Sequence, residues 1–158
     1  MKKYLFATFL VSVSTITNAT VKDSTIIYDL PDSVKAVQFM AEINVLNDRK
    51  SNFLAGIKTS QIILSIMPYQ GTSRFVFQFP STAMIIEKGA NVIQSLPFVM
   101  TFDYIWDYKD TCRFLISTAS DSVQNFCLYS GYVFFPKEKK WKLIGTCRIE
   151  RELNGIRE

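Results

Sequence analysis

Apolar and polar residues alternate in several short runs of this chain, and that alternation constrains the fold more than any other feature. In VQFMAEINV (residues 37–45) every second residue is apolar, and in SRFVFQFP (residues 73–80) three phenylalanines alternate with other residues until Pro80 ends the run. A period of two is typical of a β-strand with one buried face. Since no longer stretch has a clear helical period, we expect little helix apart from the N-terminus.

More apolar runs, rich in Phe, Tyr, Val and Ile, follow between turn residues. They read VMTFDYIWDY, TCRFLIST, NFCLYSGYVFF and WKLIGTCRI (residues 99–108, 111–118, 125–135 and 141–149). About eight to ten short strands of this kind predict an all-β fold. We expect an antiparallel, jelly-roll-like β-sandwich that forms a single domain.

The N-terminus predicts export. Residues 1–19 contain Lys2 and Lys3, an apolar stretch from Tyr4 to Val13, and a polar segment that ends at Ala19. This layout is typical of a secretory signal peptide. The alternative is a retained membrane anchor, which needs about 20 apolar residues, roughly twice the length of this stretch. We therefore expect residues 20–158 to form the domain of a periplasmic or extracellular protein, with no stable membrane insertion after processing.

The composition excludes several kinds of chemistry. The chain has no histidine, so catalysis by a Ser-His-Asp triad and zinc binding through histidine are both excluded. The net charge is +4, and two of these charges belong to the predicted signal peptide, so nucleic acid is not an expected partner. We expect no catalytic residue, no metal site and no cofactor.

The three cysteines are Cys112, Cys127 and Cys147, and no two of them form a Cys-x-x-Cys pair. We expect buried and mostly reduced thiols on strands. In a hairpin register that pairs Phe135 with Trp141, Cys127 lies opposite Ile149 and Cys147 lies opposite Tyr129, which makes the two cysteines diagonal neighbours. Diagonal neighbours are about 7 to 8 Å apart, which is beyond the usual range for a disulfide. A bulge could still bring them together, so a Cys127–Cys147 bridge is the alternative.

The densest group of charges is KEKKWK at residues 137–142. Its position between two apolar runs predicts a hairpin turn in which the charges are solvated, and the alternative is a docking patch for an acidic partner. In the strand that follows, we expect alternate residues to share one face, with Trp141 as a core anchor. These residues are Trp141, Leu143, Gly145, Cys147 and Ile149.

An aromatic row is the candidate binding site. In strand geometry Phe102, Tyr104, Trp106 and Tyr108 project from one face, and Asp103 and Asp107 project from the other. Aromatic faces stack on sugar rings and carboxylates accept hydrogen bonds from hydroxyl groups, so we take Asp103, Tyr104, Trp106, Asp107 and Tyr108 as candidate ligand-binding residues. The alternative places the row in the core. A pair of catalytic carboxylates would need a separation of about 5 to 10 Å, whereas Asp103 and Asp107 are about 13 Å apart along a strand.

The C-terminal half resembles a known family. The stretches IWDYKDTCRFLIS and NFCLYSGYVFFPKEKKWKLIGTCRIER (residues 105–117 and 125–151) are similar to the closing part of domain of unknown function 3472, and IIEKGANV (residues 85–92) resembles an earlier Lys-Gly segment. The family's Gly-rich acidic stretch is replaced here by SLPFVMTF (residues 95–102). The resemblance implies an exported bacterial β-sandwich of a carbohydrate-recognising type, and it transfers no activity.

These observations predict an exported, non-catalytic binding or accessory module, with glycan as the leading ligand class. The first alternative is a structural or protein-interaction domain of the cell envelope. A glycoside hydrolase or lyase that uses carboxylates is the third interpretation.

Overall fold

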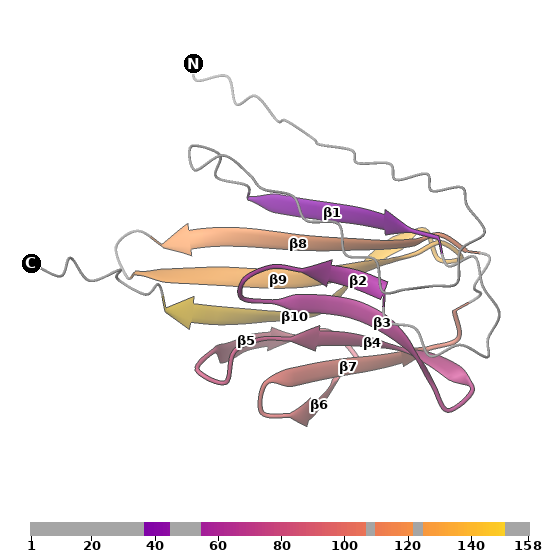
Figure 1. The fold of residues 1–158 in the computed structure, drawn as a ribbon, viewed down its shortest axis with the longest axis horizontal. Coiled ribbons are helices and arrows are strands. Elements are labelled where there is room, and N and C mark those ends of the chain that lie inside the picture. Colours follow the sequence, from indigo (N-terminus) through magenta and orange to yellow (C-terminus); the bar gives the residue numbers. More distant parts are fainter. Residues whose placement is uncertain (1–36, 45–54, 107–109, 122–124, 151–158) are drawn as a thin grey trace, which may run out of the picture.

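The chain folds as two antiparallel β-sheets packed face to face (Figure 1). The computed structural model describes residues 37–44, 55–106, 110–121 and 125–150. These residues form ten strands and no helix, so none of them forms a helical membrane span. The predicted all-β sandwich is confirmed. The predicted signal peptide, residues 1–19, lies outside the described residues.

Each sheet has five strands. Sheet A has the order β1 (Gln38–Ile43), β8 (Cys112–Asp121), β9 (Phe126–Phe135), β10 (Lys140–Glu150) and β5 (Met84–Lys88). Sheet B has the order β2 (Ala55–Lys58), β3 (Ile63–Tyr69), β4 (Thr72–Gln78), β7 (Val99–Tyr104) and β6 (Ile93–Leu96). Most neighbouring strands are joined as hairpins, whereas β5 and β6 follow each other in the chain and belong to different sheets.

Phenylalanines from both sheets meet in the core. Phe75 on β4 lies 5.7 Å from Phe135 on β9 and 6.2 Å from Phe114 on β8, measured between ring centroids, and both contacts are edge-to-face. Pairs of this kind contribute about 0.5–1.5 kcal/mol beyond the burial of their area. The alternation seen in the sequence therefore places one phenylalanine after another between the sheets.

A pair of glycines fits against two large side chains across the core. Gly131 on β9 lies opposite Gly145 on β10 in sheet A, and Phe77 lies opposite Met100 in sheet B. A Cβ atom on Gly131 would lie 2.8 Å from a ring carbon of Phe77, and a Cβ atom on Gly145 would overlap the sulfur of Met100. Because Gly131 and Gly145 have no side chains, they leave the space that Phe77 and Met100 occupy.

Strand β10 contains a β-bulge at Ile144. Trp141 pairs with Phe134 and Leu143 pairs with Tyr132, but the next pair is Gly145 with Gly131, so one residue of β10 has no counterpart on β9. The buried Ile144 is the extra residue. A bulge reverses the alternation of faces beyond it. The expectation of one shared face was wrong: Gly145, Cys147 and Ile149 face the core, whereas Trp141 and Leu143 lie on the outer face.

Trp141 is therefore not the core anchor that the sequence predicted. Its side chain is 41% exposed. The turn before it, residues 136–139, closes the hairpin at the pair Phe135 and Lys140. The charged residues 137–140 are exposed, as expected for a solvated turn. Lys139 has a positive φ of 52°.

The predicted neighbours of Cys127 and Cys147 are confirmed, although Phe135 pairs with Lys140 instead of Trp141 and the bulge at Ile144 restores the register. The prediction of buried thiols holds for Cys112 and Cys147 but not for Cys127, which is partly exposed. Cys147 lies opposite Tyr129, and Cys127 lies opposite Ile149. Cys112 and Cys147 are buried free thiols, so Cys147 forms no bridge to Cys127. Burial raises the pKa of Cys147 to about 12 and also raises the pKa of Cys112, which keeps both thiols protonated.

Candidate functional site

The aromatic row of the sequence prediction packs mainly inside the sandwich. Phe102 and Tyr104 lie beside Phe75 and Ser73 of β4 and project toward sheet A. The Tyr104 ring lies 4.2 Å and the Phe102 ring 5.8 Å from the ring of Phe135, measured between centroids. Trp106 is only 9% exposed. Asp107 and Tyr108 lie outside the described residues. The ring faces of the described members are thus largely engaged in contacts within the protein.

Two polar groups of this row have unusual surroundings. The indole Nε1 of Trp106 is buried and has no hydrogen-bond acceptor among the residues that the structure describes, which is rare for a buried donor. The pKa of Tyr104 is raised, first by burial and then by the negative charges of Glu138 and Asp110. Both observations describe a weakly solvated end of the core.

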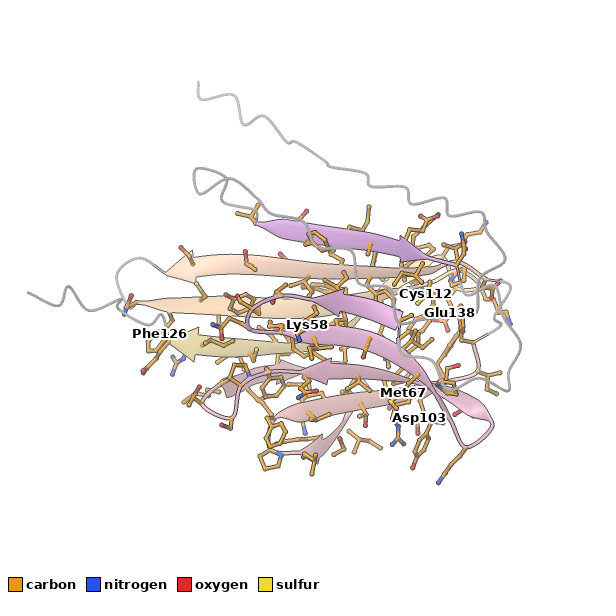
Figure 2. The ribbon with its side chains drawn as sticks, in the orientation of Figure 1. Lys58, Met67, Asp103, Cys112, Phe126 and Glu138 are labelled. Atoms are coloured by element: carbon orange, nitrogen blue, oxygen red, sulfur yellow. The ribbon has the colours of Figure 1, made fainter. Side chains whose placement is uncertain are left out.

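Asp103 projects from the outer face of sheet B, where it is held by an arginine. Arg74 donates from Nε to Oδ1 at 2.6 Å and from a terminal nitrogen to Oδ2 at 2.8 Å. The guanidinium carbon also lies 3.2 Å from the centroid of the Tyr69 ring. Figure 2 shows Asp103 close to Met67, which belongs to the same cross-strand row.

The electrostatics of Asp103 are those of a structural ion pair. The hydrogen bonds from Arg74 lower the pKa of Asp103, and the same contact raises the pKa of Arg74. A general acid in glycoside hydrolysis needs a raised pKa instead. Exposed pairs of this kind stabilise a fold by at most about 1 kcal/mol. The pKa of Asp103 is therefore shifted in the direction opposite to the one that a catalytic acid requires.

A second aromatic surface lies on the outer face of sheet A. We call it the aromatic strip and define it by Phe126, Tyr132 and Phe134 of β9 together with Trp141 of β10. The three β9 residues are partly exposed and alternate with Cys127, Val133 and Phe135, which lie on the core side. From Phe126 to Phe134 the strip runs about 27 Å at 3.3–3.4 Å per residue.

Cross-strand neighbours determine the chemistry of each end of the strip. At one end Trp141 and Phe134 form an aromatic pair with ring centroids 5.4 Å apart, and the guanidinium carbon of Arg113 lies 5.2 Å from the Phe134 centroid. Arg113 Nε also donates to Glu42 Oε2 at 2.7 Å. At the other end the guanidinium of Arg148 lies 4.3 Å over the Phe126 ring.

The neighbours of Tyr132 on both sides are apolar. Leu115 of β8 and Leu143 of β10 lie opposite Tyr132, and both are partly exposed. Figure 2 shows Phe126 and Glu138 at opposite ends of the molecule, and the β9–β10 hairpin runs between them. Between Phe126 and Tyr132 the outer face is polar, because Ser130 lies opposite Ser117 and Thr146 and shares a hydrogen bond with Thr146. The apolar part of the strip is thus the group of Tyr132, Phe134 and Trp141, and the ion pair of Arg113 and Glu42 lies on its Phe134 side.

The sequence analysis missed this surface, although one signal for it was present. Phe134 and Phe135 are consecutive, and consecutive residues of a strand point to opposite faces. One of the two rings therefore has to lie outside the core. Because Phe135 is buried, Phe134 is the outer one, and its cross-strand partner Trp141 lies outside with it.

Comparisons with known proteins identify no relative. The sequence matches no protein-family model and no curated protein. The resemblance to domain of unknown function 3472 therefore stays a prediction. Within the described ranges, no group of three or more Cys, Asp or Glu side chains is placed to hold a metal ion.

Proposed function

We propose that this protein is an exported, non-catalytic binding or accessory module, with glycan as its leading ligand class and the aromatic strip of sheet A as its binding surface. The exposure of Trp141 beside Phe134 carries the proposal. A buried aromatic side chain stabilises a fold by roughly 4–6 kcal/mol, from about 150–250 Å² at 25 cal/mol per Å². A Trp that is 41% exposed forgoes part of this stabilisation, and a ligand that covers the ring would recover it.

The neighbours of Trp141 suit a sugar. The apolar face of a pyranose ring stacks on an aromatic ring, and its hydroxyl groups need donors and acceptors close by. Glu42 and Arg113 supply both beside Phe134.

The strip supports this function better than the row at residues 102–108 does. Trp106 is nearly buried, the Tyr104 ring packs on Phe135, and Asp103 is bound to Arg74. A ligand at these three residues would have to replace contacts within the protein. Trp141, in contrast, is 41% exposed and is open to a ligand.

A structural or protein-interaction domain of the envelope is the second candidate, and one observation favours it. Four large apolar side chains are about half exposed or more on β5 and β6, which are edge strands of the two sheets. They are Met84, Ile86, Ile93 and Leu96. Exposed edges accept added strands from other chains. A carboxylate-based hydrolase stays third, because the pKa of Asp103 is lowered.

The test begins with the protein exported from a bacterial host. Its intact mass is expected to lack residues 1–19. Binding to an array of neutral and acidic glycans is then measured, followed by titration of the best ligand. Weak binding with a Kd of about 1 mM corresponds to roughly −4 kcal/mol. We expect Trp141→Ala to weaken binding about tenfold or more, since stacking on one ring contributes about 1–3 kcal/mol in comparable base-binding sites.

The same variant is expected to lose only about 1 kcal/mol of stability, which is typical of a lost aromatic cross-strand pair. Ile93→Ala is the control, because Ile93 is exposed on the other sheet, and it should bind as the wild type does. Wild-type affinity in Trp141→Ala would remove the strip from the proposal. A wild-type protein that binds no glycan on the array would overturn the function.

A further inference from the structure

A row of side chains crosses sheet A at the exposed tryptophan. Glu42 of β1, Arg113 of β8, Phe134 of β9 and Trp141 of β10 are successive cross-strand partners. Directly opposite residues of an antiparallel pair lie on the same face of a sheet, so the whole row lies on the outer face. Neighbouring strands are about 4.7–4.9 Å apart, which makes the row about 14 Å long. Each of its side chains is at least partly exposed.

The surface around the rings extends across the strands and ends along them. The neighbouring row on the same face is apolar and partly exposed, and it consists of Met40, Leu115, Tyr132 and Leu143. The row beyond that one is polar, and it includes Ser117, Ser130 and Thr146. A ligand that followed β9 would therefore leave the apolar surface after Tyr132. A ligand that lies across the strands passes from the rings to the ion pair instead.

The two ion pairs among the described residues differ in the hydrogen-bonding groups that they leave available. Arg74 binds both carboxylate oxygens of Asp103. Arg113 binds Glu42 through one hydrogen bond, from Nε to Oε2 at 2.7 Å. Within the part of the chain that the structure describes, the terminal nitrogens of Arg113 and Oε1 of Glu42 have no hydrogen-bond partner, and the two side chains are 41% and 44% exposed. This pair thus presents donors and an acceptor side by side.

The pairing of Arg113 with Glu42 favours an uncharged ligand. The two charges cancel, so a charged group on the ligand would be repelled by one member of the pair as it approached the other. Two adjacent hydroxyl groups of a sugar suit the pair better, because a hydroxyl group both donates and accepts. One hydroxyl group can donate to the carboxylate while its neighbour accepts from the guanidinium.

We infer that the ligand is a neutral sugar chain that lies across the strands of sheet A, with one ring at Trp141 and two adjacent hydroxyl groups of a following sugar bound by Glu42 and Arg113. This inference rests on the proposed function and names the class and the direction of its ligand. The linkage of the chain decides whether such hydroxyl groups exist. A 1,4-linked chain of pyranoses has free O2 and O3 on each sugar, whereas a 1,3-linked chain has no adjacent free pair between its ends.

The experiment compares neutral polysaccharides that differ in linkage. The probes are soluble 1,4-linked glucan, mannan and xylan, a soluble 1,3-linked glucan, and the 1,4-linked glucan oxidised to its C6 carboxylate, in affinity electrophoresis and titration. We expect at least one neutral 1,4-linked chain to bind more tightly than the 1,3-linked glucan and the oxidised glucan do. The affinity for its oligosaccharides should rise up to about three sugars and then level off, since the row is about 14 Å long.

Two double variants test the ion pair. Glu42→Ala/Arg113→Ala removes both charges and leaves neither without its partner. It should weaken binding of the 1,4-linked chain about tenfold, as expected for the loss of hydrogen bonds to charged groups, and leave binding of the 1,3-linked glucan unchanged. Arg74→Ala/Asp103→Ala removes the corresponding pair on sheet B and should change neither. Glu42→Gln keeps the size of the side chain and should weaken binding in the same direction even if the double variant does not fold.

Two single variants test the direction of the chain. Phe126 lies on β9 beyond the polar row, so Phe126→Ala should bind the 1,4-linked chain as the wild type does. Trp141→Ala should weaken this binding about tenfold, as expected for the loss of one stacking ring. An equal loss in the two variants would place the chain along β9 and overturn the inference.

The remaining outcomes separate the two proposals. Equal binding of the 1,4-linked and 1,3-linked chains, or equal loss in the two double variants, overturns the inference and leaves the glycan module standing. Tighter binding of the oxidised glucan than of the neutral glucan does the same, because it shows an acidic ligand. No binding of any polysaccharide overturns both proposals.

Discussion

The two tryptophans occupy opposite environments. Trp106 is buried at the end of the core, and its Nε1 has no acceptor within the described ranges, whereas Trp141 is exposed on the outer face of sheet A. Nothing in the immediate neighbours of either residue distinguishes them, since both stand in alternating runs. The outward position of Trp141 follows from its strand face, whereas Trp106 lies two residues beyond the end of β7.

Trp106→Ala tests the burial of the aromatic row. We expect the variant to lose about 3–5 kcal/mol of unfolding free energy, as large-to-small core substitutions do. That is a large share of the 5–15 kcal/mol typical of a domain. Chemical denaturation beside the wild type measures the loss.

Trp106→Phe is the conservative control for this residue. It keeps most of the apolar volume and removes the buried N–H that has no acceptor, so it should cost far less than the alanine variant. An unchanged denaturation midpoint in Trp106→Ala would return the row at residues 102–108 to the position of an exposed platform.

At the scale of elements, only one of the two turn residues of the β3–β4 hairpin is of a type that favours the backbone conformation of the turn. Tyr69 pairs with Thr72, and the two residues between them, Gln70 and Gly71, have positive φ values of 43° and 80°. A type I′ turn requires this conformation and favours Asn-Gly. We expect Gln70→Asn to stabilise the protein by about 0.5 kcal/mol, because Asn tolerates a positive φ better than Gln does.

Thermal and urea denaturation of Gln70→Asn measure this effect. Gln70→Val serves as the opposite control, since a β-branched residue is strained at positive φ and should destabilise the hairpin. Equal midpoints for the two variants would mean that the turn conformation does not limit the stability of the hairpin.

The elements themselves were largely predictable from alternation, whereas their faces were not. The period of two located the strands around Phe75, Phe114 and Phe135, because apolar burial requires it. The outward direction of Trp141 was missed, because the prediction placed it on the same face as Gly145, Cys147 and Ile149, and a single extra residue at Ile144 separates these faces. A bulge depends on packing between strands, which the local pattern does not record.

The type of the candidate site was predicted from the sequence, but its position was not. An aromatic surface next to charged residues was expected, and the structure places one on sheet A instead of at residues 102–108. Asp103 illustrates the reason. Its partner Arg74 is 29 residues away in the chain, so no local pattern showed that the carboxylate is engaged.

At the scale of the whole molecule, the arrangement of the sheets depends on pairings that are distant in sequence. Gln38 on β1 pairs with Ser117 on β8, and Cys147 on β10 pairs with Ile85 on β5. Alternation predicted a sandwich but not these pairings. Gly89 is one residue that allows the pairing of β5 with β10. Its N–H donates to Ile144 O, and a Cβ atom at this position would overlap the carbonyl of Leu143.

Gly131→Ala tests how the two sheets fit together. The added methyl group would collide with the Phe77 ring, and overpacking of this kind costs about 1–3 kcal/mol. Combining it with Phe77→Leu should destabilise the protein less than the two single changes added together, by about 1 kcal/mol, because neighbouring core residues are coupled. Urea denaturation of the four proteins in the cycle measures the coupling.

Gly71→Ala is the matched control for this cycle. Gly71 has no atom near its hypothetical Cβ, and its positive φ of 80° makes the substitution costly through the backbone alone. It should destabilise the protein and show no coupling to Phe77→Leu. Purely additive effects for Gly131→Ala would contradict the proposed fit of glycine against phenylalanine.

The fit of Phe77 and Met100 against the two glycines also restricts motion between the layers. Packed layers often shear past each other by small side-chain shifts. Here a slide along the strands would drive the two large side chains out of the glycine gap and into neighbouring side chains of sheet A. The outer face of that sheet therefore presents its rings on a rigid support. A ligand on such a surface loses little affinity to the ordering of its receptor, because a preorganised surface has few conformations to give up.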